Sequence, residues 1–156
     1  MIVLSIDPGT LESAYVLMTG TYEILGFGKV ENNEMLKVIR KHDTVEHFVI
    51  ESMTSYGMAV GASIFTSCIW IGRFVQCAID WYNPKFVEYI YRPEVKLNIC
   101  KSVRAKDSNI RRALLDRYGE VGTKKNKGVL YGFKSDIFSA LAVGTTYLDK
   151  LKNDEL

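Results

Sequence analysis

The stretch that decides the fold stands at the start of the chain, where residues 2–10 read IVLSIDPGT. The run from Ile2 to Ile6 is apolar and rich in β-branched residues, as in a central strand covered on both faces. Pro8 cannot donate to a sheet ladder and Gly9 permits a tight turn, so the strand ends near Asp7. A carboxylate in that place either serves a ligand, because ligands of open α/β sheets gather at strand ends, or caps the turn.

Length and composition fit one globular domain over residues 1–156, with 47% hydrophobic and 24% charged residues. No apolar run approaches the roughly 20 residues that cross a bilayer, and no secretory signal is visible. We therefore expect a cytoplasmic protein with no membrane contact. Three cysteines without CxxC spacing, Cys68, Cys77 and Cys100, predict reduced, buried thiols and neither a disulfide framework nor a zinc site.

Positive charge is concentrated in one segment. Residues 92–127 contain eleven Lys or Arg against four Asp or Glu, a net charge of +7, whereas the whole chain carries only +2. This asymmetry favours a face for a polyanion such as nucleic acid, and the alternative is an ordinary solvated surface.

The remaining pattern predicts an α/β fold. Strand-like apolar stretches follow at residues 13–18, 22–30, 47–51 and 86–91, and Gly20 marks a turn between the first two. Helical spacing is present at residues 31–41, 62–82, 94–101, 106–118 and 133–151. We expect a mixed five-stranded sheet, its first three strands antiparallel, with helices on both faces.

The helix predicted over residues 62–82 is apolar around nearly its whole circumference. Such a helix must be buried on all sides. We expect one face to pack on the sheet and the other on a second copy of the chain, because small domains rarely wrap a helix completely. The alternative is a helix sandwiched inside a single core.

Acidic residues end two of the predicted strands, Asp7 and Glu51, and Asp136 lies in the first turn of the last helix. If the first and fourth strands are neighbours, Asp7 and Glu51 project at one sheet edge, and a crossing helix can bring in Asp136. Clustered carboxylates raise one another's pKa unless cations are present, and oxygen-only clusters suit Mg²⁺ or Mn²⁺. The alternatives are a helix-terminus role for Asp136 and a surface role for Glu51.

Four segments together carry a resemblance to a known family: Ile6–Thr10, Ile50–Glu51, Lys106–Leu114 and Asp136–Val143. In order and spacing they resemble RuvC-type Holliday junction resolvases, especially the bacteriophage versions, within the RNase H-like superfamily. The resemblance covers essentially the whole chain. It implies an RNase H-like sheet and a metal-dependent endodeoxyribonuclease that resolves four-way DNA junctions, leaving 5′-phosphate and 3′-hydroxyl nicks.

The resemblance also implies roles for individual acids. Asp7, Glu51 and Asp136 would be catalytic and would hold Mg²⁺, two ions per site, with Mn²⁺ able to substitute. The family commonly has a further acid one turn later in the last helix, where this chain has Ser139, a weaker neutral ligand. Asp107 could compensate as a weak ligand, although we expect it to cap its helix.

The resemblance further implies a homodimer paired through helix 62–82, with two active sites facing two strands of a junction. The loop after Glu51 carries Tyr56 and Met58, which would contact bases at the crossover, and the alternative is a tyrosine folded onto the surface. The residues expected to contact DNA phosphates are Lys96, Lys101, Arg104, Lys106, Arg111, Arg112, Lys124, Lys125 and Lys127.

Two other function classes stay open. A strand followed by Asp-x-Gly-Thr also occurs in actin-like and sugar-kinase ATPases, whose second domain closes on nucleotide. A chain of 156 residues has no room for that domain, so we expect no nucleotide cofactor. The other class is a non-catalytic junction-binding protein on the same fold, which Ser139 keeps open.

Overall fold

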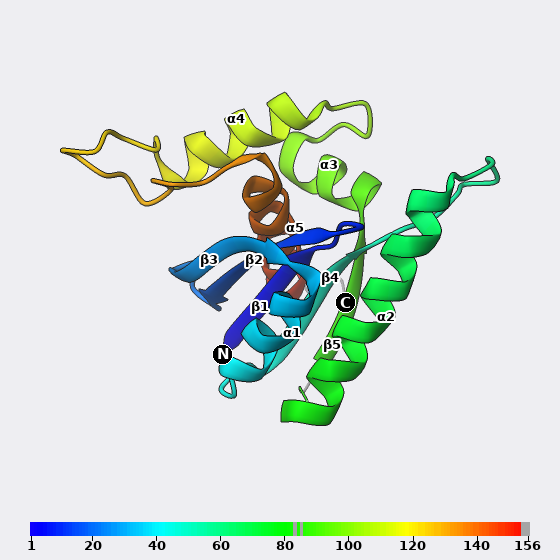
Figure 1. Cartoon of the computed structure of the whole chain (residues 1–156). Coiled ribbons are helices and arrows are strands. Elements are labelled where there is room, and N and C mark those ends of the chain that lie inside the picture. The colour runs from blue at the N-terminus through cyan, green and yellow to red at the C-terminus, as the bar shows by residue number, and fades with distance from the viewer. Residues whose placement is uncertain (83, 85, 154–156) are drawn as a thin grey trace.

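The computed structural model describes residues 1–82, 84 and 86–153, and a five-stranded sheet forms its centre. The strands are β1 (Ile2–Asp7), β2 (Glu12–Thr19), β3 (Ile24–Glu31), β4 (His47–Ser52) and β5 (Phe86–Tyr91). Their spatial order is β3-β2-β1-β4-β5 (Figure 1). The first three strands pair antiparallel, whereas β4 runs parallel to β1 and β5 runs parallel to β4. The predicted mixed sheet is confirmed.

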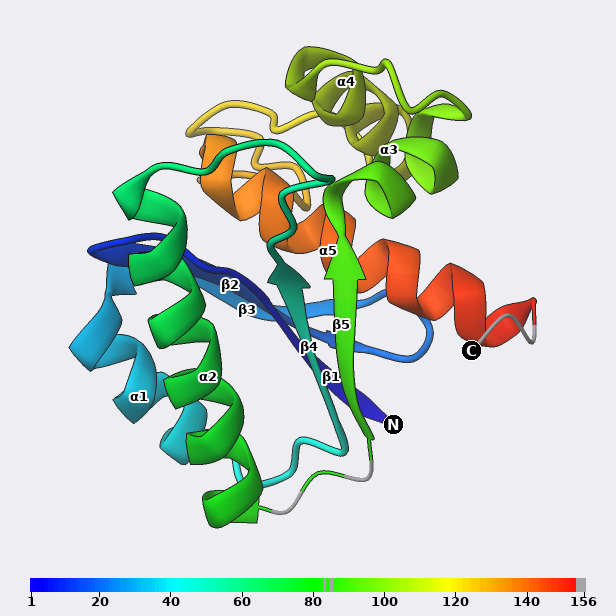
Figure 2. The same cartoon turned by 90° about the vertical axis from the view of Figure 1, so that its right-hand side faces the viewer.

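Helices cover both faces of this sheet, as expected. They are α1 (Asn32–Lys41), α2 (Ala62–Tyr82), α3 (Arg92–Cys100), α4 (Asp107–Tyr118) and α5 (Ser135–Lys152). Figure 2 shows α1 and α2 on one side, and α5 on the other with α3 and α4 beyond the strand ends. The central strand β1 is buried from both sides, because Val3 belongs to the apolar cluster under α5 and Leu4 to the cluster under α1 and α2.

The largest differences from the predicted element boundaries are two residues, at the starts of β3, α3 and α5, the last of which begins at Ser135 and not at residue 133. β3 begins at Ile24 and not at residue 22, because Tyr22 has a left-handed backbone (φ 66°) in the turn after β2. α3 begins at Arg92 and not at residue 94, because proline fits the first turn of a helix, where its missing N–H is not needed. Pro93 therefore lies in the first turn of this helix, whereas the sequence pattern predicted a break there.

The outer face of α2 is exposed. Ile71, Phe74 and Ala78 pack into the core, whereas the side chains of Phe65 and Ile69 are 62% and 64% exposed. A helix sandwiched inside a single core is therefore wrong. By length and composition alone, α2 could span a membrane, although no such segment was expected from the sequence. Its inner face nevertheless packs against the sheet and α1, as in a helix of a globular domain.

The cysteines are all free, as predicted, but none of them is fully buried. Cys68 lies on the exposed side of α2, and Cys77 and Cys100 are half-buried. The buried environment predicted for Cys68 is wrong. The apolar residues near Cys68 in the sequence include those of the exposed outer face of α2, so an apolar neighbourhood in the sequence did not mean burial.

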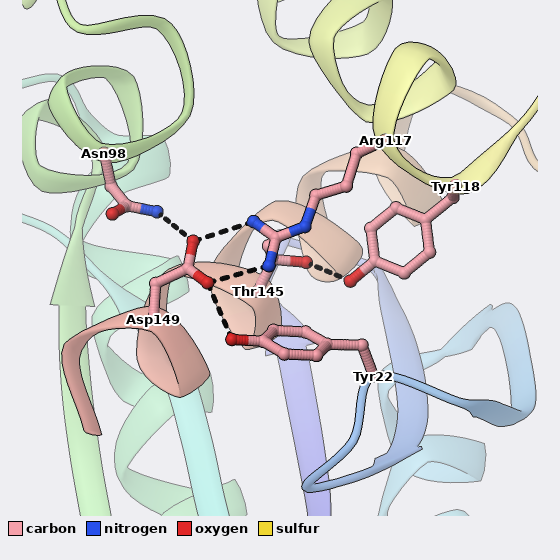
Figure 3. Close-up of polar contacts among 6 residues, drawn as sticks. All are labelled: Tyr22, Asn98, Arg117, Tyr118, Thr145 and Asp149. Carbon is pink, nitrogen blue, oxygen red and sulfur yellow. Dashed lines mark hydrogen bonds and ion pairs between the residues drawn. The ribbon is translucent and has the colours of Figure 1, made fainter. Parts of the chain in front are cut away.

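A polar network around Asp149 ties the helices together at the C-terminal end of α5 (Figure 3). The Asp149 carboxylate accepts two hydrogen bonds from Arg117, one from the Asn98 amide and one from the Tyr22 hydroxyl, each 2.8 Å long. Burial raises the pKa of Asp149, but these hydrogen bonds outweigh it and the pKa is lowered overall. The network joins α3, α4, α5 and the β2–β3 turn, and so fixes how α5 lies on the sheet.

Candidate active site

The strand register brings two of the predicted acids to one edge of the sheet. Ile6 of β1 lies opposite Ile50 of the parallel strand β4, so the residues that follow them, Asp7 and Glu51, project at the same carboxyl end. Parallel strands always present their carboxyl ends together, which is why ligands collect there in open α/β sheets.

The last helix supplies the third acid. Across the sheet, the Ser5 hydroxyl donates a hydrogen bond of 2.9 Å to the Ala140 carbonyl, which fixes the first turns of α5 beside β1. Helix and strand approach so closely that a Cβ at Gly144 would lie 2.7 Å from the Ser5 hydroxyl oxygen. Asp136 is therefore held near the end of β1, within electrostatic range of Asp7.

Asp7 is a half-buried carboxyl group without a cationic partner of its own. Burial, followed by the charges of Glu51 and Asp136, raises the pKa of Asp7 to about 8, and Arg92 only partly opposes this. Asp7 makes no ion pair and no side-chain hydrogen bond with any other residue in the described ranges. A buried charge in that state is costly unless a cation joins it.

The other two acids have basic partners. An Arg92 nitrogen, Nη1, lies 3.4 Å from Glu51 Oε2, and Nη2 of the same side chain contacts Asp107. Burial raises the pKa of Glu51, and the Arg92 charge opposes that rise. Lys29 Nζ lies 2.5 Å from Asp136 Oδ2 and 3.4 Å from Glu12 Oε2.

A cavity of about 320 Å³ adjoins Asp107 and Asp136, where the first turns of α3, α4 and α5 meet. Its lining consists of Arg92, Asp107, Ser108, Ile110, Arg111, Ser135, Asp136, Phe138 and Ser139. Helix starts present unpaired backbone N–H groups and the positive end of the helix dipole. The cavity therefore combines carboxylates with three elements that attract anions.

The donor set fits a hard divalent cation. Four carboxylates, from β1, β4, α4 and α5, and the Ser139 hydroxyl offer only oxygen, which suits Mg²⁺ or Mn²⁺, and Asp7 has no competing cation. As the side chains lie, no three His, Cys, Asp or Glu residues of the described chain converge closely enough to hold one ion. Binding an ion would require Glu51 and Asp136 to exchange Arg92 and Lys29 for it.

The expected helix cap at Asp107 is wrong. The N-cap residue of α4 is Lys106, whose backbone N–H donates to the Asn109 side-chain oxygen at 2.8 Å. Asp107 follows in the first helical turn, and its carboxylate contacts Arg92. This one-residue shift joins Asp107 to the site through Arg92.

Comparison with known proteins agrees with the expected fold. No protein-family model matches the chain, and no curated protein matches it. A structure of Thermus thermophilus RuvC matches with a TM-score of 0.69 and 17% identity, covering 99% of this chain and 97% of that one. The same protein in complex with Holliday junction substrate matches with a TM-score of 0.72 and 15% identity, covering 99% and 96%.

The chain has a RuvC-like fold. The resemblance noted in the sequence predicted that fold. Within it, the predicted acids lie at one edge of the sheet, next to the cavity formed by the helix starts.

The basic residues predicted to contact DNA are distributed over α3, the α3–α4 junction, α4 and the segment between α4 and α5. Lys96 is close enough to influence Glu51, and Arg111 lines the cavity, while Arg104 and Lys106 are exposed at the α3–α4 junction. Lys101 instead borders a second cavity near Asp149.

Arg112 pairs with acids on the protein surface. Its guanidinium lies 2.8 Å from Asp116 and also contacts Glu120, and all three side chains are exposed. The i, i+4 spacing of Arg112 and Asp116 on one helix face produces this pairing.

Two exposed segments carry the remaining candidates. The basic arm, which we define as residues 119–128, extends from the body between α4 and α5 and bears Lys124, Lys125 and Lys127 (Figure 1). A bridge between Gly122 and Lys127 narrows this arm to a turn. In the loop between β4 and α2, Tyr56 and Met58 are both largely exposed.

Sequence reasoning missed Arg92 and Lys29 as neighbours of the acids. The sequence did contain a signal for Arg92. Arg92 directly follows β5, just as Asp7 and Glu51 stand at the ends of the neighbouring strands β1 and β4, so all three could have been expected at one sheet edge. Lys29 lies within β3 and reaches an acid more than 100 positions away, so nothing in its surrounding sequence marks it.

Proposed function

We propose that this protein is a metal-dependent endonuclease that resolves four-way (Holliday) DNA junctions. One observation carries the proposal: the half-buried, unpartnered Asp7 carboxyl stands among Glu51, Asp107 and Asp136 at the carboxyl edge of the sheet. The RuvC-like fold supports it, since T. thermophilus RuvC has been seen with Holliday junction substrate.

In this proposal, Asp7, Glu51 and Asp136 hold two Mg²⁺ ions, for which Mn²⁺ can substitute, and Ser139 and Asp107 are weaker donors. The bound ions would supply an activated water and stabilise the leaving 3′ oxygen, giving 5′-phosphate and 3′-hydroxyl ends. The chain itself supplies the positioning. The starts of α3, α4 and α5 attract the phosphate. The positive charges of Lys96 and Arg111 offset the negative charge of the DNA backbone and of the nearby carboxylates.

We also propose that the enzyme is a homodimer paired through the outer face of α2. Phe65, Ile69 and Ile79 are exposed and recur along one side of this helix. Exposed apolar rows of this length mark interaction surfaces, and a pair of subunits would present two sites to the two strands of a junction. The Tyr56–Met58 loop and the basic arm would then contact the junction bases and duplex arms.

A cleavage assay on a panel of DNAs tests the function. We expect wild-type protein with Mg²⁺ or Mn²⁺ to nick a four-way junction in two strands and to leave linear duplex intact. Asp7→Asn should bind the junction without nicking it. Junction binding by the wild type without nicking in either metal would instead identify a non-catalytic junction-binding protein, and normal cleavage by Asp7→Asn would exclude the assigned site.

A further inference from the structure

Two basic side chains contact the acids of the candidate site, and Arg92 is the less exposed of them. Its side chain is 26% exposed, against 35% for Lys29. One nitrogen, Nη1, lies 3.4 Å from Glu51 Oε2 and the other, Nη2, contacts Asp107. Arg92 therefore joins an acid at the end of β4 to an acid at the start of α4.

The fold fixes Arg92 in this place. β5 pairs with β4 so that Glu51 lies opposite Ile90 and Ser52 opposite Tyr91, and Arg92 is the next residue. It is also the first residue of α3, with Pro93 behind it in the first turn, so its backbone has little freedom. The guanidinium therefore has to lie at the carboxyl edge of the sheet, between the acids and the cavity.

Arg92 and a divalent cation compete for the same carboxylate. A guanidinium beside Glu51 Oε2 repels a metal ion that Glu51 would bind, because like charges close together in a partly buried site are strongly unfavourable. A bound ion would therefore release Arg92 from Glu51. Asp107, whose side chain is 80% exposed, would keep the guanidinium at the cavity.

The released guanidinium would lie where an anion is favoured. The same cavity is lined by the first turns of three helices, and a guanidinium fork matches the oxygens of a phosphate. We propose that Arg92 is a phosphate-contacting residue that Glu51 and Asp107 hold in reserve until a divalent cation displaces it from Glu51. The inference rests on the proposed function for the identity of the anion, which is a DNA backbone phosphate. It adds an order of binding, in which the metal ion binds first and the phosphate second.

Metal titration without DNA tests the first half. Mn²⁺ binding to the wild type, Arg92→Ala, Asp107→Asn and the double variant is measured by isothermal calorimetry. We expect Arg92→Ala to bind Mn²⁺ about tenfold more tightly, because a competing charge is gone. Asp107→Asn should weaken Mn²⁺ binding more in the wild-type background, where Arg92 then pairs with Glu51 alone, than in the Arg92→Ala background, where only the weak donor role of Asp107 is lost.

Arg111→Ala is the matched control. Arg111 lines the same cavity but stacks over the Phe138 ring at 5.0 Å, and it makes no ion pair with any acid of the described chain. Its removal should change Mn²⁺ affinity by less than about threefold, because a solvated charge without a carboxylate contact is largely screened.

Junction binding tests the second half. With Ca²⁺ in place of Mg²⁺, Arg92→Ala should bind a four-way junction about tenfold more weakly than the wild type, and the slope of log affinity against log salt should fall by about one. Metal affinity and junction affinity would thus move in opposite directions, which a merely structural role for Arg92 does not produce. Arg92→Gln, which keeps a polar side chain and part of its length without the charge, should behave like Arg92→Ala and serves if the alanine variant does not fold.

The outcomes separate this inference from the proposed function. Mn²⁺ binding that Arg92→Ala and Arg92→Gln leave unchanged or weaken, in a wild type that does bind Mn²⁺, would overturn only the role of Arg92. Equal weakening by Asp107→Asn in both backgrounds would mean that Asp107 acts on the metal alone and does not hold Arg92, which would also overturn the role of Arg92. If neither the wild type nor the Arg92 variants bind Mn²⁺, this inference and the proposed metal site are both wrong.

Discussion

Replacing Asp7 by asparagine should stabilise the metal-free protein, although the same change should abolish cleavage. The reason is the environment of the carboxyl group, which is half-buried, lies close to Glu51 and Asp136, and has no cationic partner of its own. Ionised Asp7 therefore costs the native state free energy that an uncharged asparagine of the same shape does not.

The size of this effect follows from the pKa. Asp7 has a pKa of about 8 in the fold against 3.8 for the free side chain, so the native state holds its proton more tightly than the unfolded state does. This tighter proton binding contributes fully to the free energy of unfolding below the pKa of Asp7 in the unfolded state. The contribution is lost as the pH rises through the pKa of Asp7 in the folded state. Between about pH 5 and pH 8 the loss amounts to as much as about 4 kcal/mol.

Urea denaturation in EDTA, followed by tryptophan fluorescence, measures the free energy of unfolding at these two pH values. The advantage of Asp7→Asn over the wild type should grow with pH, and added Mg²⁺ should stabilise the wild type more than the variant. Asp149→Asn is the control, because hydrogen bonds from Arg117, Asn98 and Tyr22 stabilise the Asp149 carboxylate, and its loss should destabilise the protein at pH values near 8 by about 2 kcal/mol. An Asp7→Asn variant that is less stable than the wild type in EDTA at the higher pH would refute the reasoning.

Three further changes test other parts of the site and surface. Ser139→Asp adds an acid to the cavity and should tighten Mn²⁺ binding about tenfold in a calorimetric titration, whereas unchanged affinity would show that position 139 does not face the ion. Joint replacement of Phe65 and Ile69 by glutamate should convert a dimer to a monomer in analytical ultracentrifugation while changing the free energy of unfolding by less than about 1 kcal/mol, and a monomeric wild type would contradict the proposed interface. Replacing the three lysines of the basic arm by alanine should lower the salt slope of junction binding by about two to three, and a slope equal to that of the wild type would exclude the arm from the DNA interface.

The sheet was predictable because its signals are local. The apolar run of β1 stops at Pro8, and the strand of residues 47–51 ends on Glu51 in the same way, so two parallel strand ends with acids could be expected. Asp136 needed the family resemblance, because nothing in its own surroundings in the sequence shows that α5 crosses the end of β1.

The exposed face of α2 and the contacts of Arg92 and Asp107 could not be predicted from the sequence pattern. Apolar residues cover α2 almost completely, but hydrophobicity alone does not separate the face on the core from the face that is left exposed. Proline at position 93 signalled a break, yet the helix starts one residue before it, and that difference puts Arg92 among the acids. A similar one-residue shift at the start of α4 turned Asp107 from an expected cap into a partner of Arg92.

The four carboxylates come from β1, β4, α4 and α5, which lie far apart along the polypeptide. During synthesis on the ribosome the first of them emerges almost at once, but Asp136 follows only after more than 120 further residues. A nascent chain shorter than 136 residues therefore lacks part of the set of acids, and the proposed nuclease would remain inert until α5 has been made and has packed on the sheet.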